Sequence, residues 1–259
     1  MSIKSKVLAA ATTLTLVGGV GMAGALTAGT ASAATPSCGP SCINLFSHQF
    51  GNFASPNYTV DVLRQGEKTG QPIILFRQSN SDPALDWTVA FQGNVSDFFA
   101  AGLVSAAVNL HYGCASINNV CTGSGLTVFP NDPAFENEYA PFGVDSGLCL
   151  GVAATAFNDE GVTLQPCGVS SKTVWILDTY DQFSFRTALQ DGVPLINGSD
   201  TNFSQPFVLT YPNQGFPTDL PRPQLVVTNL TGFSQGTGGP EVNSVNSNQL
   251  WGATFGVLP

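Results

Sequence analysis

Short segments in which apolar and polar residues alternate recur along the chain from residue 43 onward. Alternation with a period of two is the pattern of a strand that has one buried face and one solvated face. The sequence therefore predicts a first set of four strands, with Gly66 and Gly70 in the turn after the second strand. The four strands are at 43–46, 58–63, 72–76 and 86–91.

The same pattern predicts two further sets of four strands. The second set is at 139–142, 148–152, 161–164 and 174–178, and the third is at 183–186, 193–196, 207–211 and 249–255. Two segments rich in polar residues, proline or glycine interrupt these sets, at 113–138 and 212–248, and both are predicted to be insertions. The second insertion contains the apolar run 225–227, which we expect to form an extra hairpin.

Each set has one tryptophan in its last strand: Trp87, Trp175 and Trp251, at intervals of 88 and 76 residues. Units of four short strands cannot each bury a core, so three of them should pack around a pseudo-threefold axis or as a small barrel. The predicted repeats are about 43–96, 139–180 and 183–256. The only plausible helix is 97–108, whose small and apolar residues fit a buried pair of strands equally well.

The first 33 residues have the pattern of a secretory signal peptide. Lys4 and Lys6 precede an apolar run, and Ala31-Ser32-Ala33 is a small-x-small cleavage pattern. Threonines and glycines interrupt the apolar run, which makes it a poor membrane anchor. We therefore expect residues 34–259 to form a single exported domain that is released outside the cell.

The charge of the exported part limits its partners. Without Lys4 and Lys6 it has six basic residues against seventeen acidic ones, a net charge of −11. This balance disfavours nucleic acid and anionic membranes as partners. Only 10% of all residues are charged, so Asn, Gln, Ser and Thr must supply most of the wet surface. Uncharged amides and hydroxyls suit a neutral glycan or polysaccharide as partner.

All six cysteines follow the predicted signal peptide, and an even number in an oxidising compartment favours disulfides. Several pairings are open to six cysteines. Closing short loops needs the least rearrangement, which favours the sequential pairs Cys38 with Cys42, Cys114 with Cys121, and Cys149 with Cys167. A metal site is the alternative, but Cys-x-x-Cys does not occur and His48 and His111 lack ligand spacing to any cysteine. Neither a metal nor a cofactor is predicted.

The middle repeat carries a recognisable set of motifs. Its parts are Cys149-Leu150-Gly151-Val152, the strand 162–167, and Thr173-Val174-Trp175. These resemble the ricin-type β-trefoil family, whose three repeats combine a Cys-hydrophobic-Asp-Val strand, a strand ending in an aromatic residue, and Gln-x-Trp. The resemblance implies an all-β trefoil-like fold with four strands in each repeat. Family members often bridge the cysteines that match Cys149 and Cys167.

The resemblance also implies candidate ligand-binding residues. In that family a carboxylate and an amide bind sugar hydroxyls while an aromatic ring stacks on the sugar. The middle repeat has lost these groups, since Gly151 and Gln165 replace the acid and the aromatic residue. The first repeat keeps Asp61 and Phe76. The third repeat keeps Asn248 and Gln249 with Tyr211 as a candidate platform, but has Ile196 at the acid position.

These features favour a secreted, non-catalytic binding protein, with a structural or adhesive scaffold that binds no sugar as the alternative. A remote alternative is a serine hydrolase, since the segment 232–236 reads Gly-x-Ser-x-Gly with Ser234 as the nucleophile. That motif needs a strand before it, a helix after it and a later histidine, whereas His48 and His111 both precede Ser234. No carboxylate pair is singled out for glycoside cleavage either, so no catalytic residue is predicted.

Overall fold

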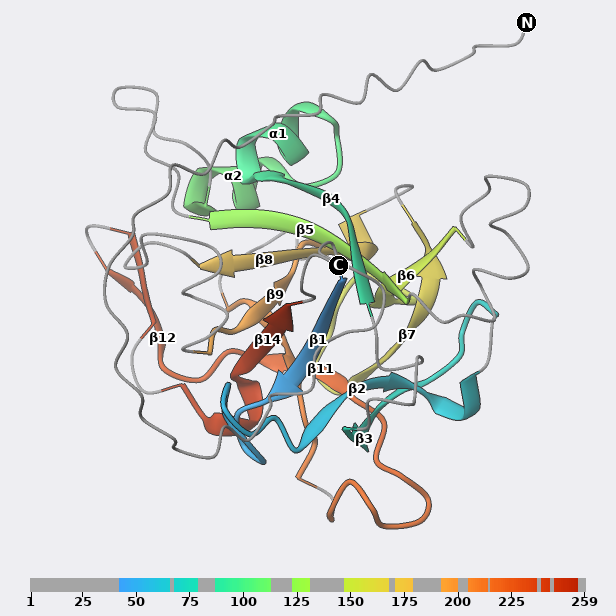
Figure 1. The fold of residues 1–259 in the computed structure, drawn as a ribbon. Coiled ribbons are helices and arrows are strands. Elements are labelled where there is room, and N and C mark those ends of the chain that lie inside the picture. The colour runs from blue at the N-terminus through green and yellow to red at the C-terminus, as the bar shows by residue number, and fades with distance from the viewer. Residues whose placement is uncertain are drawn as a thin grey trace, which may run out of the picture. The chain divides into compact units, whose positions relative to one another are not determined.

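Strands make up most of the regular structure in the computed structural model of this chain (Figure 1). The structure describes residues 42–65, 68–78, 87–112, 123–130, 147–167, 171–178, 192–199, 205–213, 215–236, 239–242 and 245–255. All of them belong to one unit, Ala31–Pro259. The predicted signal peptide at 1–33 lies outside the described residues, so it stays a prediction.

Six strands pair in a closed antiparallel ring. They are β1 (Cys42–Ser47), β4 (Trp87–Asn94), β5 (Gly123–Pro130), β8 (Val174–Asp178), β9 (Leu195–Asn197) and β14 (Trp251–Phe255). The ring runs β1, β4, β5, β8 and β9, and β14 returns to β1. The segment that leads into β9 completes the ring through a bridge between Val193 and Trp251, with both N···O distances at 2.9 Å. This ring is a six-stranded barrel.

Three hairpins cap the barrel. They pair β2 (Tyr58–Val62) with β3 (Ile73–Arg77), β6 (Leu148–Val152) with β7 (Glu160–Pro166), and β10 (Phe207–Thr210) with β11 (Val226–Asn229). Each hairpin is bridged to the other two, through Pro72 with Thr163, Val226 with Gly161, and Ile74 with Gln224. A six-stranded barrel closed by a triangle of three hairpins defines an all-β, β-trefoil-like fold.

The three tryptophans tie the barrel to the hairpins. The indole Nε1 of Trp87 donates to the Val60 carbonyl at 2.9 Å, that of Trp175 to Leu150 at 2.9 Å, and that of Trp251 to Leu209 at 2.7 Å. All three indoles are fully buried in one core cluster. Because an indole N–H must find an acceptor when it is buried, each bond fixes the position of one hairpin over the barrel.

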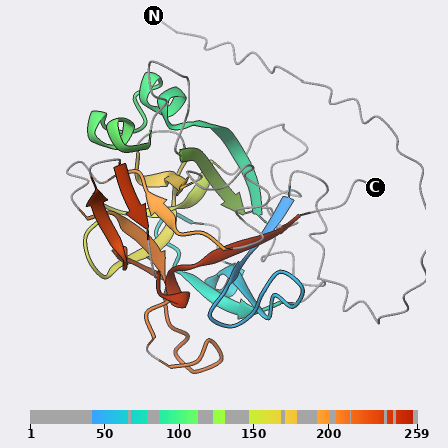
Figure 2. The ribbon, with the colours of Figure 1, turned by 90° about the vertical axis from the view of Figure 1, so that its left-hand side faces the viewer.

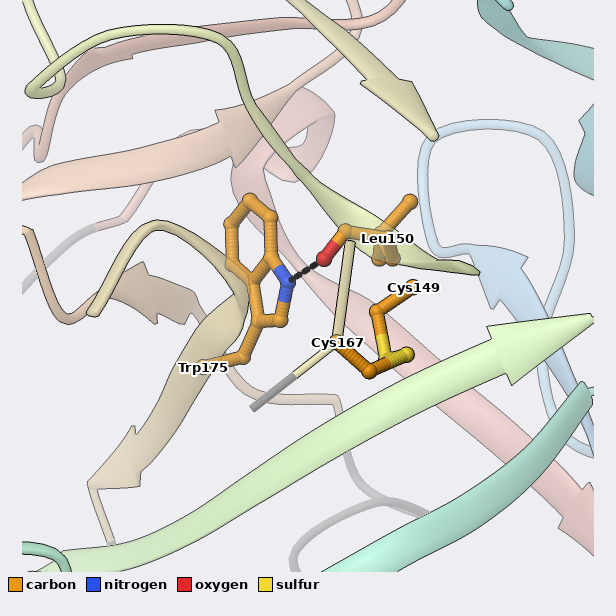
Figure 3. Close-up of a disulfide and its surroundings, with 4 residues drawn as sticks. All are labelled: Cys149, Leu150, Cys167 and Trp175. Atoms are coloured by element: carbon orange, nitrogen blue, oxygen red, sulfur yellow. Dashed lines mark hydrogen bonds between the residues drawn. A yellow bond between two sulfur atoms is a disulfide. The ribbon is translucent and has the colours of Figure 1, made fainter. Parts of the chain in front are cut away.

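One predicted disulfide is confirmed, between Cys149 and Cys167 (Figure 3). The register of β6 and β7 pairs Cys149 with Gln165, which brings Cys167 within reach at a Cα–Cα distance of 5.1 Å. The next residue after Cys149 is Leu150, the acceptor of the Trp175 indole. Cys38, Cys114 and Cys121 lie outside the described residues, so the other two pairings stay predictions.

Two short helices, α1 (Val95–Ala100) and α2 (Ala106–Tyr112), occupy the stretch that was predicted to be either a helix or a strand pair. Gly102, at a φ of 72°, ends the first helix in a conformation that favours glycine. Ser105 begins the second by accepting the Val108 N–H at 3.2 Å through its hydroxyl. Both helices pack on the outer side of β8, β9 and β10. They lie at the opposite end of the fold from the loop between β10 and β11 (Figure 2).

Two strands lie where the sequence predicted insertions. Strand β5 lies within 113–138, which was expected to be a polar insertion, because its pairing with β4 and β8 outweighs a weak local pattern. Strand β11 lies within 212–248 and is part of the third cap hairpin rather than an extra one. The expected strands at 139–142 and 183–186 lie outside the described residues.

The segment with the Gly-x-Ser-x-Gly pattern is also a strand. Ser234 lies inside β12 (Phe233–Gly236), which pairs with β13 (Gly239–Val242), and its backbone partner in that register is Glu241. A nucleophile elbow instead requires its serine at the turn between a strand and a helix. The described residues also include three single-turn 3-10 helices, η1 (Leu63–Gln65), η4 (Ser171–Thr173) and η5 (Ser247–Gln249).

We predict that Trp175→Phe lowers the free energy of unfolding by at least about 1–3 kcal/mol, because the buried Leu150 carbonyl loses its donor. Urea unfolding followed by far-ultraviolet circular dichroism measures this change. Phe157→Leu is the control, since that side chain is 55% exposed and should change stability by less than about 0.5 kcal/mol. Equal stability of the Trp175 variant and the parent would contradict the prediction.

Candidate functional site

The indole hydrogen bonds align the three hairpins residue by residue. The acceptor in each hairpin, Val60, Leu150 or Leu209, faces the core. Side chains alternate across a strand, so the next residue in each hairpin faces away from the core. Those residues are Asp61, Gly151 and Thr210.

Aligning the hairpins in this way changes which residue of the third repeat corresponds to Asp61. The expected acid position at Ile196 lies in barrel strand β9 instead of a cap hairpin, because the third repeat begins one strand later than the sequence pattern indicated. The residue of the third repeat that corresponds to Asp61 is Thr210. Only the first repeat therefore has a carboxylate at this position.

The first repeat brings its two candidate residues together. Asp61 pairs with Ile74, and Phe76 pairs with Thr59. Paired residues share a face, and so do residues two apart on one strand, so Asp61 and Phe76 are diagonal neighbours on the outer face of the β2–β3 hairpin. Asp61 is 6% exposed and Phe76 is half-buried. The carboxylate thus lies at the bottom of this face, beside the ring.

Two amides that the sequence analysis did not single out accompany this pair. Gln78 follows β3 and donates through Nε2 to Oδ1 of Asn44 at 3.1 Å. Asn44 lies two residues before Phe46 on β1, and Phe46 pairs with Thr59, so Asn44 shares the face of Asp61. A polar residue in the otherwise apolar predicted strand 43–46 is the signal by which Asn44 could have been found. A carboxylate, an aromatic ring and two amides are therefore gathered on one hairpin face.

An arginine from a distant part of the chain completes this surface. The guanidinium carbon of Arg222 lies 4.4 Å from the centre of the Phe76 ring, within cation–π range. Arg222 belongs to the loop 211–225, which is anchored on the hairpin where Leu225 N donates to the Ile73 carbonyl at 2.8 Å. No periodic pattern in the sequence indicated Arg222, because it lies between Pro221 and Pro223 in an irregular segment.

The second repeat has no space for a ligand at this position. A Cβ atom on Gly151 would lie 2.9 Å from the Lys172 carbonyl oxygen and 2.9 Å from Cγ2 of Thr173. The backbone of η4 therefore fills the place where the first repeat has its carboxylate. This geometry agrees with the expectation that the middle repeat is structural.

We predict that Gly151→Ala lowers the free energy of unfolding by about 1–3 kcal/mol, because the added methyl group overlaps the Lys172 carbonyl oxygen and the Thr173 methyl group of η4. Gly151→Asp should lower it further, so an acid cannot be restored here by a single substitution. Thermal or urea unfolding measures both effects. Thr155→Ser, an exposed change in the turn of the same hairpin, should stay within about 0.5 kcal/mol, and a Gly151 variant as stable as this control would refute the overlap.

The third repeat uses its polar groups internally. Gln249 is 2% exposed. Its Nε2 donates to Oγ1 of Thr228 at 2.9 Å and to the Asn229 carbonyl at 2.9 Å. Its Oε1 accepts from the backbone N and the hydroxyl of Thr231 at 2.9 and 2.8 Å. Asn248 likewise donates through Nδ2 to the Tyr211 carbonyl at 2.9 Å. These two amides hold the third repeat together.

Tyr211 is a core residue rather than an exposed platform. Its ring is fully buried and lies edge-on to Phe50, with the ring centres 5.0 Å apart. Its hydroxyl donates to the Gly215 carbonyl at 2.7 Å. Burial, with contributions from Asp219 and Tyr58, raises the pKa of Tyr211 from 10.0 to about 12.

The raised pKa of Tyr211 predicts a loss of stability at alkaline pH. Between about pH 10 and about pH 12 the unfolded chain releases this proton while the folded protein retains it, so stability should fall by about 2–3 kcal/mol across that window. Below about pH 10 the tyrosine should contribute no pH dependence. Urea unfolding at a series of pH values, compared with Tyr211→Phe, isolates this contribution. The same pH slope in both proteins would be evidence against it.

Two features are absent from the described residues. Within them, no three His, Cys, Asp or Glu side chains are grouped as a metal site requires. None of the helices in that part of the chain has the length and apolar character needed to cross a bilayer.

No family model matches this chain, and the search of curated proteins found no match either. Solved structures do resemble it. A designed threefold-symmetric protein, ThreeFoil, is 12% identical with a TM-score of 0.45, over 83% of this chain and 98% of its own. The Rhizoctonia solani agglutinin is 14% identical with a TM-score of 0.42, over 85% and 97%.

An exo-β-1,3-galactanase from Clostridium thermocellum is 10% identical with a TM-score of 0.45, over 85% of this chain. This chain spans 31% of the galactanase. Since all three TM-scores are below 0.5, the fold assignment rests on the strand pairing described above. These likenesses carry no argument about function.

Proposed function

We propose that this protein is a non-catalytic carbohydrate-binding protein whose binding site is the outer face of the β2–β3 hairpin. The observation that supports the proposal is that Asp61 and Phe76 are diagonal neighbours on this face. In the other two repeats the corresponding positions are occupied by Gly151 and Thr210. The chain therefore retains one set of ligand groups out of three.

The chemistry of this face suits a sugar. An aromatic ring offers an apolar surface to the C–H side of a pyranose, and a carboxylate accepts hydrogen bonds from adjacent hydroxyls with charge assistance. The amides of Gln78 and Asn44 have both donors and acceptors for the remaining hydroxyls. Because Asp61 is 6% exposed, its hydrogen bonds to a ligand would be shielded from water and correspondingly stronger.

We further propose that the protein acts outside the cell and is a divergent relative of the ricin-type trefoils. The disulfide between Cys149 and Cys167 is typical of an oxidising compartment, and the segment 1–33 has the pattern of an export signal. Both the disulfide and the three buried tryptophans match positions in the motifs of that family.

A structural or adhesive scaffold is the second candidate. The observation in its favour is the internal use of polar groups in the second and third repeats, where Gly151 is blocked and Gln249 is fully hydrogen-bonded. A scaffold of this kind would need no ligand-binding groups in the first repeat. Direct binding measurements separate the two candidates.

A glycan array that includes neutral and acidic glycans tests the proposal. We expect residues 34–259 to bind at least one glycan class, and Asp61→Asn and Phe76→Leu each to weaken that binding about tenfold or more, as the loss of a charged hydrogen bond or a stacking surface would. The matched control is Gln165→Leu, which changes the residue of the second repeat that corresponds to Phe76.

Circular dichroism and unfolding midpoints must show that all variants are folded. Binding that responds to Gln165→Leu as strongly as to Phe76→Leu would place the site elsewhere. No binding to any glycan by the folded parent would leave the scaffold as the function.

A further inference from the structure

The few basic residues of this acidic chain are concentrated on and around the hairpin that carries the proposed site. The exported part has six Lys and Arg residues against seventeen acidic ones. Four of the six lie on the β2–β3 hairpin or against it: Arg64, Lys68, Arg77 and Arg222. Between residues 58 and 77 the sequence has only two acids, Asp61 and Glu67. The hairpin and its stacked arginine are therefore net basic on a strongly acidic protein.

The position of Arg222 over the Phe76 ring determines which kind of ligand can bind this face. Its guanidinium covers the Phe76 ring at 4.4 Å, which is the surface that a neutral sugar would stack on. The Nε atom of Arg222 is buried and has no hydrogen-bond partner among the described residues. A buried donor without an acceptor costs free energy, so the guanidinium is held here with donor capacity that no described residue uses.

Arg77 adds a positive charge to the opposite face of the same strand. It follows Phe76 directly, pairs with Tyr58, and is exposed. Arg64 and Lys68, both exposed, lie in the connection between β2 and β3. The nearest acid of the loop that carries Arg222 is Asp219, whose Oδ2 accepts the Phe216 N–H within that loop at 2.7 Å. That carboxylate is already used to fold the loop.

We propose that the ligand of this hairpin is an acidic glycan, with a uronate or sulfate group that pairs with Arg222. This inference rests on the proposed function and replaces the expectation of a neutral ligand. A guanidinium stacked on a ring keeps its N–H edge available for a bidentate bond to a carboxylate or sulfate. The acid group would bind to this edge, while the hydroxyls of the sugar bind Asp61 and the neighbouring amides.

A neutral sugar would gain less at the same place. It would have to displace Arg222 from Phe76 and lose the cation–π contact, without supplying an acceptor of equal strength for the guanidinium. An acidic sugar keeps the stacked pair and adds an ion pair at a partly buried position, where screening by salt is weak. The arrangement therefore discriminates between two glycans that differ only in charge.

Binding to three polysaccharides tests this inference: dextran as the neutral probe, dextran sulfate for sulfate groups, and polygalacturonate for carboxylates. Affinity electrophoresis with each polymer gives dissociation constants for residues 34–259 and its variants. We expect one or both acidic polymers to bind at least about tenfold more tightly than dextran. Arg222→Gln should weaken that binding about tenfold or more, and Arg222→Lys should recover only part of it, because lysine lacks the planar fork.

The control is Lys172→Gln, which removes a basic residue of the second repeat, far along the chain from the hairpin. It should leave binding unchanged if the site is specific. Equal losses in the Lys172 and Arg222 variants would mean that the acidic polymers bind positive charge anywhere on the protein without a specific site, and would overturn the inference. So would an Arg222→Gln protein that binds dextran sulfate and polygalacturonate like the parent.

The outcomes separate this inference from the proposed function. Binding of neutral glycans alone, abolished by Asp61→Asn and strengthened by Arg222→Gln, would keep the carbohydrate site but overturn the acidic ligand. It would show that Arg222 blocks the site. No binding of any glycan or polymer by the folded protein would remove both.

Discussion

The hydrogen bond from each buried indole to a hairpin carbonyl is the constraint on which the rest of this structure depends. A two-stranded hairpin is at best marginally stable alone, and each of the three obtains its stability by lying across the end of the barrel. The indole N–H of Trp87, Trp175 or Trp251 decides where each hairpin lies. It also decides which side chains face away from the core, because strand residues alternate.

The three repeats use that outward position in three ways. Gly151 allows the backbone of η4 to approach closely, so the second repeat is closed. Thr210 and Thr228 form a hydrogen-bonded pair at 2.7 Å under Gln249, so the third repeat is filled by its own polar network. The first repeat has a carboxylate beside an aromatic ring. The same hairpin geometry thus has a structural role in the second and third repeats and presents ligand-binding groups in the first.

The first repeat also differs from the other two because a positive side chain from a distant loop lies on its surface. On a chain with many more acids than bases, Arg222 comes from a loop about 150 residues beyond Phe76 in sequence and stacks on its ring. The loop is held in place by the bridge between Ile74 and Gln224 and by the bond from Leu225 to Ile73. The third repeat therefore contributes to the first repeat's surface, although its own ligand position is filled.

The sequence alone determined most of the strands, the three tryptophans that end them and the pairing of Cys149 with Cys167, because alternation and short loop closure are local properties. Tertiary structure alone decided that β5 and β11 are integral strands, since their partners are distant in sequence and their local patterns are weak. It also decided that Gln249 is a structural residue and that Arg222 covers Phe76. Those roles depend on which side chains lie within hydrogen-bond or stacking distance, and no spacing along the chain encodes that distance.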